Sequence, residues 1–268
     1  MEHDPKEIVK QTYDQLASWY LNWVDGQRSP RERYAIQVFQ NAWSTALLSS
    51  SPASQATKTV ASPTPPQVLP PPRILDLGCG PGVPVTRMLL ERGAHVVAND
   101  ISAQQLAMAR SRCCPFNSAL EPEEVTVRAT MTPRSSSSSN TGGRLVTVAG
   151  DMAGLTFEPD SFDGAVSFFA LFHLPRTEQR AVLAKVRTWL RPGALFAFNL
   201  ATIDEEAIYG EMMGRGMFWS SYSVDESCAM VRDAELDLVA AEVLESEPDD
   251  GVEFLWIVAA VPRKQRSE

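Results

Sequence analysis

The sequence has few cysteines and no apolar run long enough to cross a lipid bilayer. A membrane-spanning helix needs about 18–20 consecutive apolar residues, so we expect no membrane partner. The polar and acidic start, Met1–Asp4, is unlike a signal peptide. Because no C-x-x-C pair or zinc-like spacing occurs, we expect no metal site and predict reduced thiols in a cytoplasmic protein. The cysteines are Cys79, Cys113, Cys114 and Cys228.

The chain also lacks an excess of positive charge. It carries 24 Lys and Arg against 33 Asp and Glu, a formal net charge of −9. Attraction to phosphate dominates non-specific affinity for nucleic acid, and no block of basic residues offsets the acidic balance. We therefore expect no nucleic-acid partner. The 268 residues permit one large α/β domain or two small ones, and the sequence leaves monomer or homodimer open.

A glycine-rich turn between two apolar runs is the most informative feature present. The run Arg73–Leu77 leads into Gly78, Gly80 and Gly82, and a later run ends at Asp100. This order predicts the β-α-β unit of a nucleotide-binding fold, because glycine reaches positive φ and lets a ligand approach the backbone. Asp100 follows Gly80 by twenty residues and is placed to accept both hydroxyls of a ribose.

The glycine spacing argues against a nicotinamide-dependent oxidoreductase. A dinucleotide fingerprint needs its third glycine one residue later, where this chain has Val83. The spacing instead favours S-adenosylmethionine.

Four segments resemble successive motifs of the class I S-adenosylmethionine-dependent methyltransferases. They are ILDLGCGPG, VVANDIS, VAGDM and FDGAVSFFALFHLP, in the family's order and near its spacing, over about residues 73–200. The segments YDQLASWYLNW and MFWSSY resemble a subset that methylates small molecules. The resemblance implies an α/β fold with a Rossmann-like sheet of seven mostly parallel strands, an antiparallel C-terminal strand and an N-terminal helical cap.

Hydrophobic patterning divides the chain into three parts. We predict a helical cap over the active site (1–48), a Pro/Ser-rich linker (49–72) and a methyltransferase domain (73–268). A flexible insertion is expected at 113–144, which is rich in proline and serine. The expected helices are 5–24, one beginning at Ser29, 102–112, 177–190 and 223–234. The expected later strands are 145–149, 162–169, 194–200 after a turn at 191–193, and the antiparallel pair 236–244 and 252–261.

The resemblance also implies roles for residues at the strand ends, where ligands bind in open α/β sheets. Asp100 would hold the ribose, and Asp151 with Met152 would hold the adenine. Phe168 and Phe169 would lie beneath the methionyl part. The expected cofactor-binding set is Tyr13, Tyr20, Asp76, Gly78, Cys79, Gly80, Gly82, Asp100, Ile101, Asp151, Met152, Phe168 and Phe169.

His173 is the only histidine near the expected site, since His3 and His95 lie elsewhere. A reference pKa of about 6.5 suits a general base that removes the proton of a hydroxyl acceptor. The alternative is a structural histidine before Pro175. An apolar, partly aromatic acceptor pocket is expected from Trp19, Trp23, His173, Met217, Phe218 and Trp219, although packing of the cap explains Trp19 and Trp23 equally well.

The sequence therefore predicts transfer of a methyl group from S-adenosyl-L-methionine to a small molecule, such as a natural product, by in-line displacement. The product of the cofactor would be S-adenosyl-L-homocysteine. The alternative is a protein that binds the cofactor without methyl transfer, as a partner subunit or as the catalyst of another reaction. The acceptor atom, whether O, N, S or C, stays open.

Overall fold

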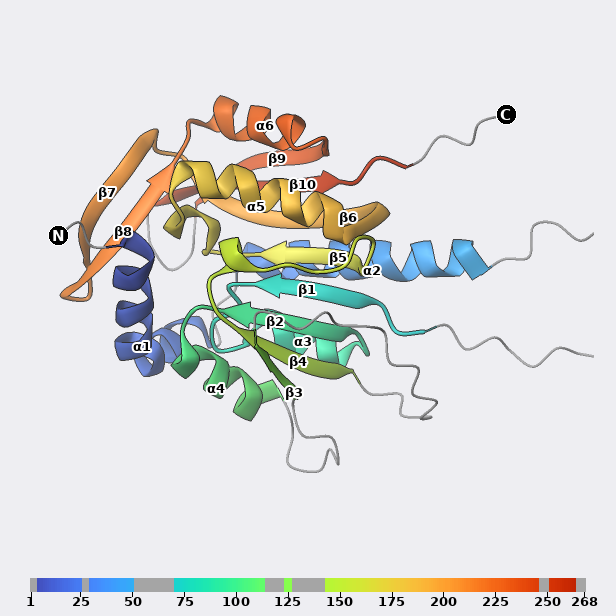
Figure 1. The fold of residues 1–268 in the computed structure, drawn as a ribbon, viewed down its shortest axis with the longest axis horizontal. Helices are drawn as coiled ribbons and strands as arrows, with labels where there is room; N and C mark the ends of the chain where they lie inside the picture. The colour runs from blue at the N-terminus through green and yellow to red at the C-terminus, as the bar shows by residue number, and fades with distance from the viewer. Residues whose placement is uncertain are drawn as a thin grey trace, which may run out of the picture.

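The computed structural model describes residues 4–25, 29–50, 70–113, 123–126, 143–245 and 251–263. Its centre is a sheet in the order β3-β4-β2-β1-β5-β6-β10-β9 (Figure 1). Neighbouring strands are parallel except at β10, which runs antiparallel to both β6 and β9. The strands are β1 (Arg73–Leu77), β2 (His95–Asp100), β3 (Glu123–Thr126), β4 (Arg144–Ala149), β5 (Phe162–Ser167), β6 (Leu190–Ala201), β9 (Asp237–Glu245) and β10 (Glu253–Ala260).

Seven of these strands confirm the expected Rossmann-like sheet with one antiparallel strand near the C-terminus. The eighth, β3, lies in the segment predicted as a flexible insertion and pairs in parallel with β4 at the sheet edge. The sequence analysis expected no strand there, and the flexibility of the segment stays a prediction. Most of that segment, like nearly all of the predicted linker, lies outside the described residues.

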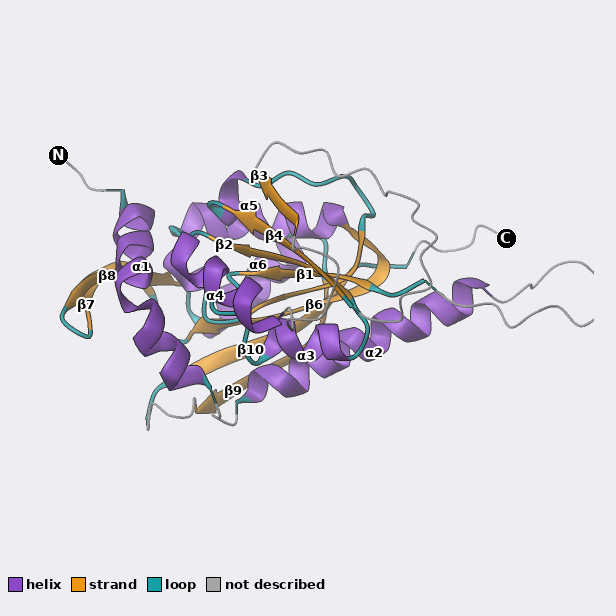
Figure 2. Cartoon of the chain, turned by 90° about the horizontal axis from the view of Figure 1, so that it is seen from below, coloured by secondary structure: helices purple, strands orange, loops and turns teal. Residues whose placement is uncertain are grey.

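Helices cover both faces of the sheet (Figure 2). Successive strand residues point to opposite faces, so Ile74 joins a core with Val38 of α2, whereas Leu75 joins a core with Val182 of α5. The helices α2, α3 and α4 contribute to the first core, and α5 and α6 to the second. The helices are α1 (Pro5–Val24), α2 (Pro30–Ser50), α3 (Val85–Glu91), α4 (Ala103–Cys113), α5 (Arg176–Trp189) and α6 (Val224–Asp233), with short 3-10 turns η1 (Met152–Gly154) and η2 (Leu171–His173).

The two N-terminal helices occupy different places, although the sequence analysis grouped them in one cap. Helix α1 lies across the carboxyl ends of the parallel strands (Figure 1). Helix α2 packs along the sheet, where a Cβ at Gly164 would come within 2.5 Å of the Val38 side chain. Tyr34 of α2 stacks on Trp256 of β10, with ring centroids 5.1 Å apart. Helix α2 is thus a layer of the domain, and only its first turn approaches the strand ends.

Two local predictions differ from the structure. The expected turn at 191–193 lies inside β6, where Gly193 has φ +85° and the register with β5 shifts, so the chain bends without leaving the sheet. The hairpin of β7 (Glu205–Met212) and β8 (Arg215–Ser221) was not predicted, because the mostly exposed β7 lacks an apolar alternation. Among the helices that the structure describes, none has the length and apolar character to cross a membrane.

Candidate functional site

The turn after β1 brings three glycines to the carboxyl end of the sheet. Gly78, Gly80 and Gly82 all have positive φ, between +54° and +78°. The amides of Gly78 and Cys79 donate to the carbonyl oxygen of Asn99, at 2.8 and 2.9 Å. A Cβ at Gly78 would collide with Ala170, so glycine is required both by conformation and by close approach.

Asp100 is fastened to this turn from the end of β2. Its Oδ2 accepts from the Gly80 amide at 2.9 Å, and its Oδ1 accepts from the Ser102 amide at 2.8 Å. A carboxylate has about four acceptor positions, so two remain for a ligand. Burial is the main cause that raises the pKa of Asp100 to about 6.

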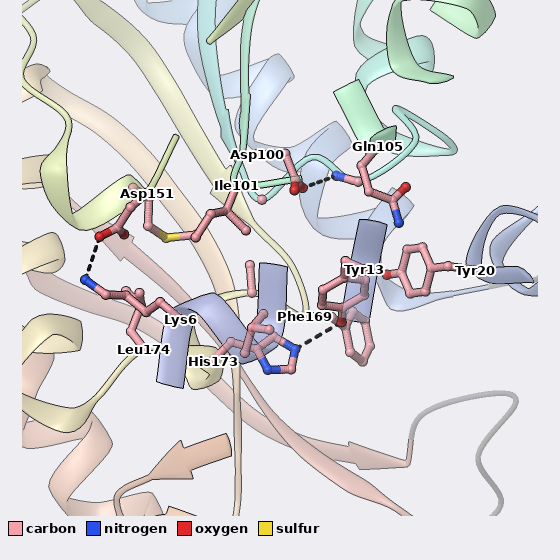
Figure 3. A pocket seen from close by; sticks show the side chains of 15 residues that line it. Lys6, Tyr13, Tyr20, Asp100, Ile101, Gln105, Asp151, Phe169, His173 and Leu174 are labelled. Atoms are coloured by element: carbon pink, nitrogen blue, oxygen red, sulfur yellow. Dashed lines mark hydrogen bonds and ion pairs between the residues drawn. The ribbon is translucent and has the colours of Figure 1, made fainter. Parts of the chain in front are cut away.

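A narrow cavity, which we call the strand-end cavity, lies between α1 and the strand ends (Figure 3). Its volume is about 60 Å³. It contains most of the residues expected around the cofactor: Tyr13, Tyr20, Gly78, Gly80, Asp100, Ile101, Asp151, Met152 and Phe169. The expected base, His173, lines it as well.

The other expected cofactor residues divide into two groups. Asp76, Cys79 and Phe168 line a small neighbouring cavity behind the turn, the glycine-turn cavity. Gly82 lines neither cavity; a Cβ there would lie 2.7 Å from the Cys113 Sγ, so Gly82 serves the packing of α4. Its expected contact with the cofactor stays a prediction.

Asp76 is buried at the end of β1 and accepts from the Thr86 hydroxyl at 2.6 Å. Burial is the main cause that raises the pKa of this carboxyl to about 7. Removing the carboxylate from water disfavours its charged form, so a nearby positive charge would stabilise it.

His173 is held in one tautomer by two hydrogen bonds. Its Nδ1 lies 2.8 Å from the Phe218 carbonyl oxygen, which can only accept, so Nδ1 carries the proton. Its Nε2 then accepts from the Tyr13 hydroxyl at 3.0 Å (Figure 3). Burial lowers the pKa of His173 to about 4 and raises that of the Tyr13 phenol well above its usual range. At neutral pH the pair therefore offers an unprotonated Nε2 beside a neutral phenol.

A larger cavity, the aromatic cavity, adjoins the strand-end cavity. Its volume is about 500 Å³, within the range of roughly 300–1,000 Å³ for small-molecule sites. The two cavities share Tyr13, Tyr20, Phe169 and His173. The remaining lining of the aromatic cavity is Trp19, Trp23, Phe172, Glu211, Met212, Met213, Trp219, Val252 and Phe254.

This lining agrees only in part with the expected acceptor pocket. Trp19, Trp23 and Trp219 are present, whereas Met217 and Phe218 are buried against Val9 of α1 and have exposed fractions of 1% and 2%. Met217 and Phe218 therefore pack α1 onto β8 instead of lining the cavity, and Phe218 contributes its carbonyl oxygen to His173. Residues from η2, β7 and β10 were missed, because only the folded chain brings them together.

Lys6 is a further residue that sequence reasoning missed. Its Nζ bonds to Asp151 Oδ2 at 2.6 Å (Figure 3) and to Glu178 at 2.9 Å. Partial burial disfavours the charge of Lys6, but the bonds to Asp151 and Glu178 outweigh that effect and raise its pKa. The first turn of α1 is thereby fastened to the acid expected to hold adenine. A single lysine in a helix offers no sequence signal for this contact.

Known proteins resemble this chain in sequence. Residues 75–198 match the family described as "Methyltransferase domain". The chain is 23% identical over 194 residues to a sterol 24-C-methyltransferase, ERG6B, of Gibberella zeae, covering 69% of this chain and 44% of that protein. It is 24% identical over 143 residues to an O-methyltransferase, rstn1, of Aspergillus nomiae, covering 53% of this chain and 52% of that protein. The chain thus spans about half or less of the length of these curated relatives.

The fold is also similar to that of a solved enzyme structure. It is the 1,6-didemethyltoxoflavin-N1-methyltransferase of Burkholderia thailandensis, with bound 1,6-didemethyltoxoflavin and S-adenosylhomocysteine. The TM-score is 0.60 at 18% identity, and the match covers 98% of this chain and 92% of that one. At this identity the likeness shows a shared fold.

Proposed function

Because the chain belongs to the S-adenosylmethionine-dependent methyltransferases, we propose that it methylates a small molecule bound in the aromatic cavity. One observation carries this proposal: the strand-end and aromatic cavities meet at Tyr13, Tyr20, Phe169 and His173. A cofactor in the first cavity and an acceptor in the second would therefore face each other. Methyl transfer needs the two reacting atoms about 3–3.5 Å apart and aligned.

The residues of the strand-end cavity fit the chemistry of the cofactor. S-adenosylmethionine supplies the methyl group as an electrophile on a positively charged sulfur. Asp100 has two unused acceptor positions for ribose hydroxyls, and Asp151 offers a carboxylate to an adenine amino group. Aromatic rings favour a nearby cation, and Tyr13, Tyr20 and Phe169 line the same space.

His173 is proposed as the base for a hydroxyl acceptor. Its Nε2 carries the lone pair, and the Tyr13 hydroxyl lies between the two cavities at hydrogen-bond distance from it. An acceptor hydroxyl that replaces Tyr13 at Nε2 would give up its proton there as its oxygen bonds to the methyl carbon. The bond from that carbon to sulfur would break at the same time, and S-adenosylhomocysteine would be the leaving group. The Phe218 carbonyl keeps the ring oriented throughout.

The acceptor class follows from the lining of the aromatic cavity. Its walls are mostly aromatic rings and methionines, with Glu211 the acidic member, so we propose a largely apolar, planar acceptor. The names of the similar proteins include a sterol C-methyltransferase and the N1-methyltransferase of 1,6-didemethyltoxoflavin. A third similar protein is named as an O-methyltransferase. The formal net charge of −9 supports a small molecule over nucleic acid. We also place the reaction in the cytoplasm, which the free thiols of Cys79 and Cys228 support.

The test is product formation from isotopically methyl-labelled S-adenosylmethionine. The protein is incubated with phenols, aromatic amines, N-heterocycles and sterols, and mass spectrometry follows both S-adenosylhomocysteine and the labelled acceptor. We expect acceptor-dependent release of S-adenosylhomocysteine matched by one labelled methyl on a planar acceptor. Tight cofactor binding with no labelled product from any class would instead favour the alternative, a cofactor-binding protein without methyl transfer.

A further inference from the structure

Phe169 has a backbone conformation that few bulky residues adopt. It lies two residues after β5 ends, and its φ is +57°. A positive φ strains any residue with a Cβ, because that atom approaches a carbonyl oxygen of the chain. Such strain persists where the surrounding structure enforces it, and it gathers at functional sites. Phe169 is at such a place, since it lines the strand-end cavity (Figure 3) and the aromatic cavity.

Asn199 of β6 holds this conformation through one hydrogen bond. Its Oδ1 accepts from the Phe169 amide at 2.7 Å. Asn199 is fully buried, and its Nδ2 has no hydrogen-bond partner among the described residues. A buried amide donor without a partner lowers stability, so an apolar side chain would suit this position of the strand better. The bond to Phe169 is what the asparagine provides in return.

The ring of Phe169 is held as firmly as its backbone. It meets Phe254 and Trp256 of β10 edge to face, with ring centroids 4.9 and 5.7 Å apart. The Arg31 guanidinium lies over the same ring, 4.4 Å from its centroid. The ring therefore forms a fixed wall where the strand-end and aromatic cavities meet, and a change of φ at Phe169 would displace that wall.

We propose that Asn199 is a positioning residue for methyl transfer: it holds Phe169 at positive φ, and the Phe169 ring sets where the acceptor lies relative to the cofactor. Asn199 is absent from the described lining of all three cavities, so it acts through Phe169. The inference rests on the proposed function, because it needs an acceptor in the aromatic cavity. A misplacement of about 1 Å can lower a rate by about 100-fold where two groups must be aligned.

The test separates alignment from folding and from cofactor binding. Asn199→Leu and Asn199→Ala remove the acceptor oxygen, whereas Asn199→Asp keeps an oxygen in the same place. The measurements are kcat at saturating cofactor and acceptor, calorimetry of S-adenosylhomocysteine, and thermal melting. We expect Asn199→Leu to lower kcat about 10–100-fold and to leave the affinity for S-adenosylhomocysteine within about threefold. Asn199→Asp should keep kcat within about threefold of the wild type.

A second pair of variants asks whether Asn199 acts through Phe169. Phe169→Gly should itself lower kcat, because the ring is gone, but glycine adopts a φ of +57° without strain. In that background Asn199→Leu should lower kcat less than about twofold further. Ser221→Ala is the matched control, because the buried Ser221 hydroxyl donates to the Ala201 carbonyl oxygen of β6 at 2.8 Å. It should leave kcat within about twofold of the wild type.

An unchanged kcat in Asn199→Leu or in Phe169→Gly would overturn the proposal, as would an equal effect of Asn199→Leu with and without the Phe169 ring. Loss of the cooperative melting transition in both Asn199→Leu and Asn199→Ala would also overturn it, because the residue would then be structural. A wild-type chain that methylates no acceptor would instead contradict the proposed function, and with it this role of Asn199.

Discussion

At the scale of single residues, the lowered pKa of His173 predicts how turnover depends on pH. A histidine of ordinary pKa would lose its base function as pH falls through about 6.5. Burial lowers the pKa of His173 to about 4, so the acid limb of kcat/KM for a hydroxyl acceptor should lie near pH 4. His173→Gln should lower kcat by roughly 10²–10⁴-fold, the usual contribution of a general base. The measurement is the pH profile of turnover for both proteins.

His95→Gln is the control, since His95 begins β2 and lines neither the strand-end cavity nor the aromatic cavity. It should leave the profile unchanged. Near-full turnover of His173→Gln with the same acid limb would mean that His173 is structural.

The lowered pKa of His173 also predicts how the stability of the fold depends on pH. The folded ring binds its proton less readily than the unfolded one, so its contribution is complete above pH 6.5 and is lost as pH falls toward 4.

Asp100 carries a separate prediction about cofactor affinity. Asp100→Asn replaces one acceptor oxygen by an amide nitrogen, which cannot accept from the amide of Gly80 or Ser102. We expect S-adenosylhomocysteine to bind about 10–100-fold more weakly by calorimetry. Asp25→Asn should have no effect, because Asp25 is exposed and pairs with Arg112 outside the cavities. Unchanged affinity in Asp100→Asn would remove Asp100 from the ribose site.

At the scale of elements, helix α1 closes the strand-end cavity through side chains. The volume of about 60 Å³ is below the roughly 300 Å³ of even small ligand sites, so we expect α1 or its side chains to move when the cofactor enters. Lys6 opposes that movement by bonding Asp151 and Glu178. Lys6→Met should raise amide exchange in the first half of α1 about threefold to tenfold, or roughly 1 kcal/mol, with the sheet unaffected. Hydrogen exchange with mass spectrometry measures this.

Lys10→Met is the matched control for that experiment. Lys10 pairs with Asp14 within α1, at 3.0 Å. Asp14 also accepts from the Ser102 hydroxyl at 2.6 Å, a bond that Lys10→Met leaves in place. Replacing Lys10 should leave the exchange of α1 close to that of the wild type. Equal protection of α1 in Lys6→Met and in the wild type would show that packing of Val9 and Leu21, rather than the ion pairs, holds the helix down.

The elements also show which features local sequence could reveal. The strands flanking the glycine turn were predicted because they have strong apolar runs. The start of α6 was predicted because Ser223 is a good cap, and its hydroxyl accepts from the Glu226 amide at 3.3 Å. Hairpin β7–β8 was missed because β7 has no buried alternation. Lys6 was missed as a site residue for a different reason. Its role depends on where α1 docks, and docking is a property of the whole chain.

At the scale of the whole molecule, the two N-terminal helices should respond differently to truncation. Helix α1 covers the cavities, whereas α2 buries Tyr34, Ala35 and Val38 against the sheet, each with an exposed fraction of 2% or less. Each large apolar side chain that is fully buried contributes about 1.5–3 kcal/mol, against a total stability of only about 5–15 kcal/mol. Loss of α2 would also expose Trp256 and its neighbours, so the remaining domain should not fold cooperatively.

Removing residues 1–25 should therefore leave a single cooperative thermal transition at a lower melting temperature. Turnover should be abolished, because this truncation removes Tyr13 and Tyr20, which line both cavities. Removing residues 1–48 should abolish the transition itself. Calorimetry and circular dichroism distinguish the two outcomes. A cooperative transition near the wild-type temperature in the longer truncation would mean that the sheet is stable without α2. Such a result would make α2 a dispensable cap. We expect the opposite, because the packing of Val38 on Gly164 makes α2 part of the domain that positions the glycine turn.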